Sequence, residues 1–296
     1  MYDTIIIGGG VAGITAAIYA ARRKMKTLVL TIDTGGQLGK ITEIENWPGE
    51  EKISGTELAT KLSRQLQRFE LEIKYTQATK IDFVKGVFTI TTGAGNFQAK
   101  SIILAFGKVP RNLGIKGEDE FIGRGVSYCA TCDAPFFKNK IVAVMGGGNS
   151  ALDAAILLSK IAAKVYLIHR REEFRGDKHL LEILSATPKI ETVLKKTVIE
   201  VRGSQRLETI VLDDGSELKV DGLFIEAGYV VNNALVKDLL ECNEAGSIIV
   251  DKRQSTSMAG IFAAGDMTDA PFQQLVIAAG EGATAALSAY EYLQTK

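Results

Sequence analysis

A strand, a glycine-rich turn and a helix occur twice along this chain, and this repeat restricts the fold more than any other feature. Near the N-terminus, "DTIIIGGGVAGITAAIYAARR" places a β-branched run before Gly8, Gly10 and Gly13 and an alanine-rich helix after them. At this spacing the first glycine allows a tight turn, the second lets a pyrophosphate approach the backbone, and the third lets the helix pack closely on the strand. The segment therefore predicts a dinucleotide site at a helix N-terminus.

The same plan returns in "NKIVAVMGGGNSALDAAILLSKIAAKVYLIHRR", where Gly146 and Gly148 take the first two glycine positions and an alanine takes the third. Strand-like segments follow each copy, at 81–92 in the first and in "TVIEVRGSQRLETIVLDDGSELKV" in the second, and both are typical of antiparallel meanders. Each copy then closes with an apolar strand that ends near Gly107 or Gly228. The sequence therefore predicts two dinucleotide sites.

The rest of the chain is too short to form a third domain. It contains the strand-like "SIIVD", then "GIFAAGDMTDAP", then an apolar run from Leu275 to Leu293 that predicts a long helix. The simplest arrangement returns this tail to the first domain, so that the second domain is inserted in the first. We therefore expect an α/β fold of two Rossmann-like domains, each a three-layer ββα unit. Residues 1–110 and 232–296 would form one domain and residues 111–231 the other.

The charge balance and the apolar runs restrict the partners. Lys plus Arg and Asp plus Glu number 35 each, so no net charge attracts a nucleic acid or an anionic membrane at long range. No uninterrupted apolar run approaches the roughly 20 residues of a spanning helix, and no basic region precedes the short run at 4–7 as in a signal peptide. We expect a soluble cytoplasmic protein with no nucleic-acid or membrane partner.

The stretch "CATCDAP" contains a Cys-x-x-Cys pair, Cys129 and Cys132. Such a pair is half of many zinc sites, but the other half is missing, because Cys242 stands alone and His169 and His179 lie too far apart for the usual spacing. We therefore expect no metal. A reducing compartment keeps thiols free, and there a Cys-x-x-Cys pair can close a reversible disulfide and serve as a redox centre.

A basic cluster follows the strand "KVYLIH" of the second copy. His169, Arg170, Arg171 and Arg175 stand where an NAD-specific site would usually offer an acid to the ribose hydroxyls. Planar guanidinium groups suit a phosphate instead. The cluster therefore favours NADPH over NADH.

In these motifs and their order, the chain resembles the low-molecular-weight thioredoxin reductases, two-domain flavoproteins that use FAD and NADPH. The resemblance covers nearly the whole length and rests on "GGGVAG", "GGQL", "ENWPG", "YCATCDAPFFKNK", "GGGNSALDAA", "HRREEFR" and "GIFAAGD". The last helix, "PFQQLVIAAGEGATAALSAYEYL", is similar to the reductase core of the alkyl-hydroperoxide reductase flavoproteins. The resemblance implies an NADPH-dependent flavoprotein disulfide reductase, commonly a homodimer, that acts on thioredoxin.

The resemblance also implies roles for individual residues. Cys132 would approach the flavin, Cys129 would attack the disulfide of the protein substrate, and Asp133 would move protons during exchange. The residues expected at the FAD site are Gly8, Gly10, Val11, Ala12, Gly13, Gly35, Gly36, Gln37, Leu38, Asn46, Gly107, Gly265, Asp266, Gln273, Gln274 and Leu275. Those expected at the NADPH site are Gly146, Gly148, Asn149, Ser150, His169, Arg170, Arg171 and Arg175.

Asp266 also has an argument from the residues alone, because it follows the strand "IFAAG" at its carboxyl end, where open α/β sheets place ligands. Other positions depart from the family pattern. The stretch 273–275 reads Gln-Gln-Leu where Arg-Gln-Ala is common, Asp33 lies beyond the end of its strand, and Asn149 stands where many relatives have an acid.

Three alternatives to a thioredoxin reductase stay open from the sequence. The substrate could be another thiol protein, such as a glutaredoxin-like protein or the redox module of a peroxidase. The electron donor could be ferredoxin or a deazaflavin, which the arginine cluster disfavours. Finally, the chain could be a flavin-binding redox sensor without turnover, which the intact Cys-x-x-Cys pair disfavours.

Overall fold

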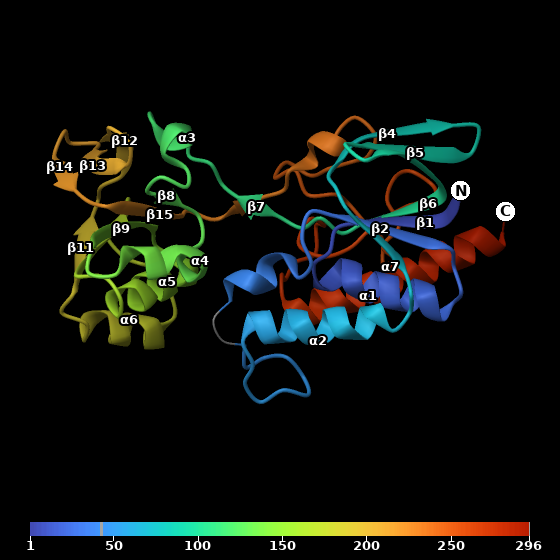
Figure 1. Ribbon diagram of the computed structural model, residues 1–296, viewed down its shortest axis with the longest axis horizontal. Coiled ribbons are helices and arrows are strands. Elements are labelled where there is room, and N and C mark those ends of the chain that lie inside the picture. The colour runs from blue at the N-terminus through green and yellow to red at the C-terminus, as the bar shows by residue number, and fades with distance from the viewer. Residues whose placement is uncertain (42–43, 296) are drawn as a thin grey trace. The chain divides into compact units, whose positions relative to one another are not determined.

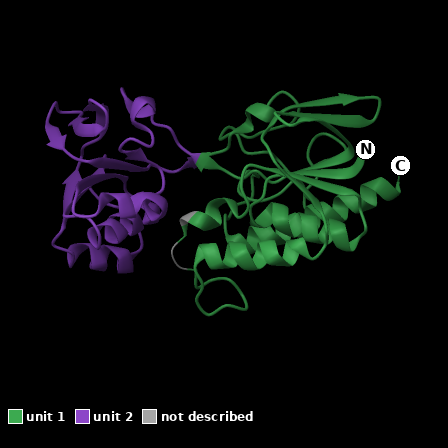
Figure 2. Cartoon of the chain, in the orientation of Figure 1, with its two compact units in different colours: residues 1–109, 230–296 green, residues 110–229 purple. Residues whose placement is uncertain are grey.

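The computed structural model describes residues 1–41 and 44–295, and within them the chain forms two compact units (Figure 1). Figure 2 shows that the first unit is built from two separate stretches, 1–109 and 230–296, and that the second unit is the single stretch 110–229. The chain passes between the units at β7 (Val109–Pro110) and β16 (Tyr229–Val230), and these two short strands pair with each other.

The first unit is a sheet with helices on one face. The sheet has the order β3 (Glu72–Tyr75), β2 (Thr27–Thr31), β1 (Tyr2–Ile7), β6 (Gly95–Leu104), β5 (Val87–Thr92) and β4 (Ala78–Val84), and β17 (Ile261–Ala263) also pairs with β6. Pairing is parallel among β1, β2, β3, β6 and β17, and antiparallel along β4, β5 and β6. Helices α1 (Val11–Arg22), α2 (Gly55–Gln67) and α7 (Leu275–Gln294) lie on one side of this sheet (Figure 1).

Alternation along the strands explains this layering. In β1, Ile6 packs into the cluster that contains the helices, whereas Ile5 and Ile7 pack into the cluster on the opposite face. Both faces of the parallel strands are therefore buried, which is why these strands are continuous apolar runs in the sequence.

The second unit repeats the plan. Its parallel sheet has the order β11 (Ile190–Leu194), β10 (Lys164–His169), β9 (Ile141–Gly146), β15 (Gly222–Glu226) and β8 (Val126–Ser127). Helices α5 (Asn149–Ser159) and α6 (Lys178–Ser185) pack on one face. On the other face packs an antiparallel sheet of β12 (Val198–Gly203), β13 (Leu207–Leu212) and β14 (Glu217–Lys219) (Figure 1). The predicted α/β fold with two Rossmann-like units is confirmed.

Two details differ from the sequence prediction. The segment "SIIVD" is not a strand, because Ile248 makes only isolated bridges, to Cys242 on one side and Thr268 on the other. The strand-like stretch 81–92 is divided by a hairpin turn between β4 and β5, where Lys85 and Gly86 both have positive φ, 49° and 82°. The predicted long helix is confirmed as α7.

Candidate functional site

Cys129 and Cys132 form a disulfide in the second unit, with their Cα atoms 5.3 Å apart. One residue, Tyr128, separates β8 from the pair. Cys132 lies in the short helix α4 (Ala130–Asp133), which precedes the 3-10 helix η2 (Ala134–Phe137). The backbone N–H of Cys132 donates to Sγ of Cys129 at 3.2 Å. Cys129 is partly buried, Cys132 is exposed, and Asp133 is half-buried directly after it. The predicted cysteine pair is therefore a closed disulfide, and Cys132 is its exposed member.

In the first glycine turn, close packing requires glycine at positions 8 and 13 but not at position 10. A Cβ on Gly8 would lie 2.2 Å from the carbonyl oxygen of Ala105, and a Cβ on Gly13 would lie 2.0 Å from that of Gly8. By contrast, a Cβ on Gly10, the residue that precedes α1, would meet nothing within 4 Å. The space beside Gly10 at the helix N-terminus is thus open, as a bound pyrophosphate requires.

The loop after β2 packs against this turn. The N–H of Gly35 donates to the carbonyl of Gly9 at 2.7 Å, and a Cβ on Gly36 would lie 3.2 Å from Cα of Gly10. Leu38, in the 3-10 helix η1 (Gly36–Lys40), is fully buried in the core on the helix side of the sheet. Asp33 accepts a 2.8 Å hydrogen bond from the N–H of Gly36. The acid that the sequence placed beyond its strand therefore stabilises the loop.

Asp266 lies after β17, at the carboxyl end of the parallel strands, and accepts a 3.4 Å hydrogen bond from Nε2 of Gln37. Burial raises the pKa of the Asp266 carboxyl, while Lys108 and the Gln37 hydrogen bond act in the opposite direction. The preceding N–H, that of Gly265, donates to Oε2 of Glu281 at 2.7 Å. The loop after β17 is therefore held from two sides.

Sequence reasoning missed Glu281. This residue lies on α7, and burial raises the pKa of its carboxyl, as do the nearby acids Asp266 and Asp269. The signal was present, because Glu281 is the one charged residue between positions 275 and 290 of an otherwise apolar helix.

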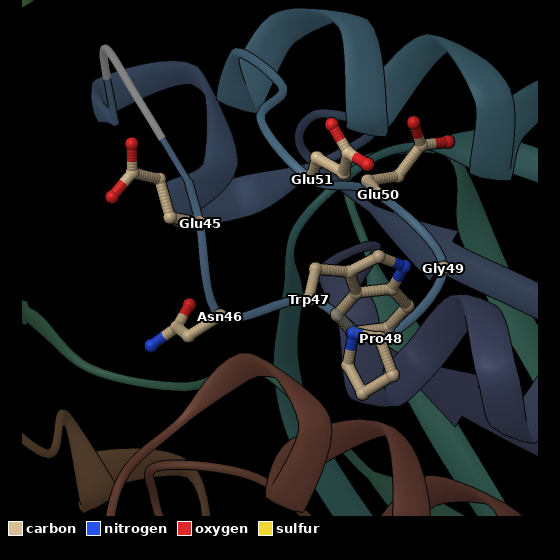
Figure 3. Close-up of a pocket in the computed structure, with 7 residues that line it drawn as sticks. All are labelled: Glu45, Asn46, Trp47, Pro48, Gly49, Glu50 and Glu51. Carbon is tan, nitrogen blue, oxygen red and sulfur yellow. The ribbon is translucent and has the colours of Figure 1, made fainter.

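The residues before α7 contact the loop at 44–53. Nδ2 of Asn46 donates to Oε1 of Gln274 at 3.1 Å, and Nε2 of Gln273 donates to the carbonyl oxygen of Asp266 at 3.5 Å. Seven consecutive residues, Glu45 to Glu51, line a cavity of about 540 Å³ (Figure 3). In Figure 3 the Asn46 side chain points away from that of Trp47, which packs against the core on the helix side. Gln273 and Gln274 thus connect the start of α7 with Asp266 and Asn46.

In the second glycine turn, too, packing requires the first glycine and leaves open space beside the central one. A Cβ on Gly146 would lie 2.4 Å from the carbonyl oxygen of Glu226, whereas a Cβ on Gly148 would meet nothing within 4 Å. A Cβ on the intervening Gly147 would lie 2.2 Å from the His169 ring, which is 9% exposed. Burial lowers the pKa of His169, and its Nε2 has no hydrogen-bond partner. His169 therefore packs under the turn.

The arginine loop is tied to the second turn by three hydrogen bonds. The N–H of Arg175 donates to the carbonyl of Gly147 at 2.7 Å. Asn149 donates to the Asp177 carboxylate at 2.8 Å and accepts from the Asp177 N–H at 2.9 Å. Arg170, Arg171 and Arg175 are exposed. The structure thus places three exposed arginines in one loop that is hydrogen-bonded to the second glycine turn.

Residues 1–41 and 44–295 hold neither a metal cluster nor a membrane-spanning helix. There, no three His, Cys, Asp or Glu side chains converge in a way that could hold a metal ion. No helix within those ranges combines the length and the apolar composition needed to cross a bilayer.

Comparison with known proteins places the chain in a family. A model of the pyridine nucleotide-disulphide oxidoreductases matches residues 2–282. The chain belongs to this family. A thioredoxin reductase of Helicobacter pylori (strain J99 / ATCC 700824) is 44% identical to this chain, and the match covers 99% of each sequence. The crystal structure of Lactococcus lactis thioredoxin reductase has a TM-score of 0.93 at 38% identity and covers 100% of both chains.

Two other relatives of this chain are not named thioredoxin reductases. An alkyl hydroperoxide reductase protein of Pseudomonas putida is 38% identical over 99% of this chain and 58% of its own length, so the expected likeness to that reductase is confirmed. A glucosaminate ammonia-lyase of Pseudomonas fluorescens is 41% identical over 98% of this chain and 95% of its own length. Because relatives at this level carry different activities in their names, the function of this chain has to be inferred from the residues of its site.

Proposed function

We propose that this oxidoreductase is an NADPH-dependent thioredoxin-disulfide reductase, in which electrons pass through FAD and the pair Cys129–Cys132 to a disulfide of thioredoxin. The observation that carries the proposal is the closed disulfide between these two cysteines. The same chain has two glycine turns in which the space beside the central glycine, Gly10 or Gly148, is open to a dinucleotide. FAD and NADPH, when bound, supply a two-electron route from a nicotinamide to a disulfide.

The residues of the first unit fit FAD. The open space beside Gly10 meets the N-terminus of the twelve-residue helix α1, whose unpaired N–H groups favour phosphate. Asp266, half-buried and oriented by Gln37, would accept hydrogen bonds from hydroxyl groups of the ribityl chain. We therefore assign FAD to the unit of residues 1–109 and 230–296, and NADPH to the unit of residues 110–229.

In the second unit, the exposed guanidinium groups of Arg170, Arg171 and Arg175 would hold the 2′-phosphate of NADPH. The hydrogen bonds between Asn149 and Asp177 keep the loop that carries them against the glycine turn. Because His169 is buried under the turn, its role is to support the backbone beside the cofactor more than to bind phosphate itself.

The cysteines divide the thiol chemistry. Two electrons and two protons convert the disulfide into two thiols, and the Cys129 thiolate then attacks one sulfur of the thioredoxin disulfide and displaces the other. Cys132 next attacks Cys129 in the mixed disulfide, which restores the original bond and releases thioredoxin as a dithiol. The N–H of Cys132 points at Sγ of Cys129 from 3.2 Å, so it favours a thiolate there. Asp133, directly after the pair, is positioned to exchange protons with solvent during these steps.

Thioredoxin as the partner, a homodimeric state and a cytoplasmic location are parts of the same proposal. Relatives named thioredoxin reductases support thioredoxin as the partner. The resemblance to a family that commonly forms homodimers supports the homodimeric state. A pair that cycles between disulfide and dithiol works best where other thiols are kept reduced, which supports the cytoplasmic location. Light scattering of the purified protein tests the dimer.

The proposal is tested by following NADPH oxidation with thioredoxin as acceptor. Cys129→Ser and Cys132→Ser should each abolish this turnover, while both variants keep NADPH-dependent reduction of ferricyanide, which needs no thiol. Normal thioredoxin turnover by either variant would contradict the proposal. A higher kcat/KM for a glutaredoxin-like protein or a peroxidase module would identify a different substrate. Failure of NADPH to bleach the flavin without oxygen would point to ferredoxin or a deazaflavin as donor.

A further inference from the structure

Glu118 is a carboxylate inside the core of the second unit. Its residue is only 1% exposed, although it lies in the four-residue helix α3 (Glu118–Phe121) near the start of the unit. Burying a charged carboxylate costs free energy unless hydrogen bonds replace the lost water. The neighbours of Glu118 therefore show what holds it there.

Three donors converge on the two oxygens of Glu118. The N–H of Leu113 and the hydroxyl of Tyr128 donate to Oε1 at 3.1 Å and 2.5 Å, and the N–H of Ile115 donates to Oε2 at 3.0 Å. Two of these donors are backbone groups of the segment that follows β7, and the third is a side chain from a different segment. Glu118 therefore ties the beginning of the unit to Tyr128.

Tyr128 is the residue directly before Cys129. Burial raises the pKa of the Tyr128 phenol, and the Glu118 carboxylate raises it further, so the hydroxyl remains a donor. The Cys129 backbone is held as well, because its N–H donates to Oγ of Ser127 at 3.0 Å and its carbonyl accepts from the same hydroxyl at 3.3 Å. The N-terminal half of the disulfide loop is thus fixed through a side chain and through the backbone.

We propose that Glu118 and Tyr128 are positioning residues for the redox-active pair, and that their hydrogen bond favours the disulfide over the dithiol. Closing a ring loses less conformational entropy when one of its ends is already held. Without the Tyr128 hydroxyl, the reduced loop gains freedom that the disulfide does not, so the equilibrium shifts toward the dithiol. The inference rests on the proposed function in taking this disulfide as the redox centre.

The test is a redox titration of the Cys129–Cys132 pair in the full chain with its flavin bound. Mixtures of oxidised and reduced dithiothreitol set the equilibrium, in which the protein dithiol gives two electrons and two protons to the reagent disulfide. Alkylation and mass spectrometry give the fraction oxidised. For Tyr128→Phe we expect the equilibrium constant for disulfide formation to fall about three- to tenfold, the range set by losing one hydrogen bond of ordinary strength.

A matched control removes a phenol hydroxyl elsewhere in the unit. Tyr166, on β10, accepts a 2.9 Å hydrogen bond from Lys164, and Tyr166→Phe should leave the equilibrium constant unchanged. Glu118→Gln keeps one acceptor oxygen and the size of the side chain but removes the negative charge, which weakens the hydrogen bond from the Tyr128 hydroxyl. It should therefore shift the equilibrium in the same direction as Tyr128→Phe. An unchanged constant in Tyr128→Phe, with or without a lower melting temperature, would overturn the proposal and leave a purely structural contact.

The titration needs neither NADPH nor thioredoxin, so the two proposals fail separately. A shifted equilibrium in an enzyme that does not reduce thioredoxin would support the tether and contradict the proposed substrate. Normal thioredoxin reduction together with an unshifted equilibrium in Tyr128→Phe would support the proposed substrate and contradict the tether.

Discussion

The backbone N–H of Gly265 donates a 2.7 Å hydrogen bond to Oε2 of Glu281, which joins the loop after β17 to the helix α7. Asp266, the next residue, carries the carboxylate proposed to contact FAD. The geometry of that carboxylate therefore depends on an acid that lies elsewhere in the sequence.

Substitutions at Glu281 should separate its hydrogen bond from its charge. Glu281→Leu leaves the N–H of the buried Gly265 unpaired, which should cost about 1–3 kcal/mol of unfolding free energy. Glu281→Gln keeps an acceptor and removes repulsion with Asp266 and Asp269, so its stability should stay within about 0.5 kcal/mol of the wild type or rise. Urea denaturation of the apoproteins measures both, and equal losses in the two variants would mean that the charge matters more than the hydrogen bond.

The raised pKa of Asp266 predicts a pH-dependent effect on the apoprotein. Because the folded-state pKa lies above the unfolded value, the native state binds more protons, and stability is lost as pH rises through the folded pKa. Asp266→Asn removes this loss, so it should stabilise the apoprotein at neutral pH while weakening FAD binding. Thermal melts across pH provide the check: the advantage of the variant should disappear below the ordinary carboxyl range, and a constant advantage at every pH would refute this cause.

Gly10 and Gly13 form a matched pair for the first dinucleotide turn. Gly13→Ala places a methyl group 2.0 Å from the Gly8 carbonyl oxygen, so it should destabilise the apoprotein by about 1–3 kcal/mol. Gly10 has φ −75° and open space, so Gly10→Ala should leave apoprotein stability nearly unchanged. The same methyl group would occupy the space assigned to the pyrophosphate, so FAD affinity should fall at least about tenfold. Flavin fluorescence measures the affinity, and full affinity in Gly10→Ala would mean that no phosphate lies there.

Features that depend on neighbours in the sequence could be predicted. The two strand-turn-helix units and the long helix α7 follow from apolar periodicity and glycine spacing, which are local properties. The disulfide follows from the Cys-x-x-Cys spacing, which is local too. The segment "SIIVD" has the composition of a strand, but only Ile248 finds bridge partners, and pairing is decided by distant parts of the chain.

Glu118 and Glu281 could not be interpreted from the sequence, because each gains its meaning from donors that the fold supplies. The donors to Glu118 include the side chain of Tyr128, and the donor to Glu281 is the N–H of Gly265, which belongs to another element. A charged residue in an apolar stretch indicates a buried partner without naming it. The same limit applied to Asp33, whose bond to the Gly36 N–H is set by a loop conformation with positive φ at Gly35 and Gly36.

Nucleotide preference should depend on the exposed arginine loop of the second unit. A charge-assisted hydrogen bond contributes about 1.5–3 kcal/mol, so the double variant Arg170→Ala/Arg171→Ala should lower kcat/KM for NADPH by about tenfold to several hundredfold. NADH lacks the 2′-phosphate, so its kcat/KM should change little. Arg206→Ala removes an exposed arginine from the turn between β12 and β13 and serves as the control. Steady-state kinetics with both nucleotides decide the matter: an equal loss for NADPH and NADH would show that these arginines support the loop without recognising the phosphate.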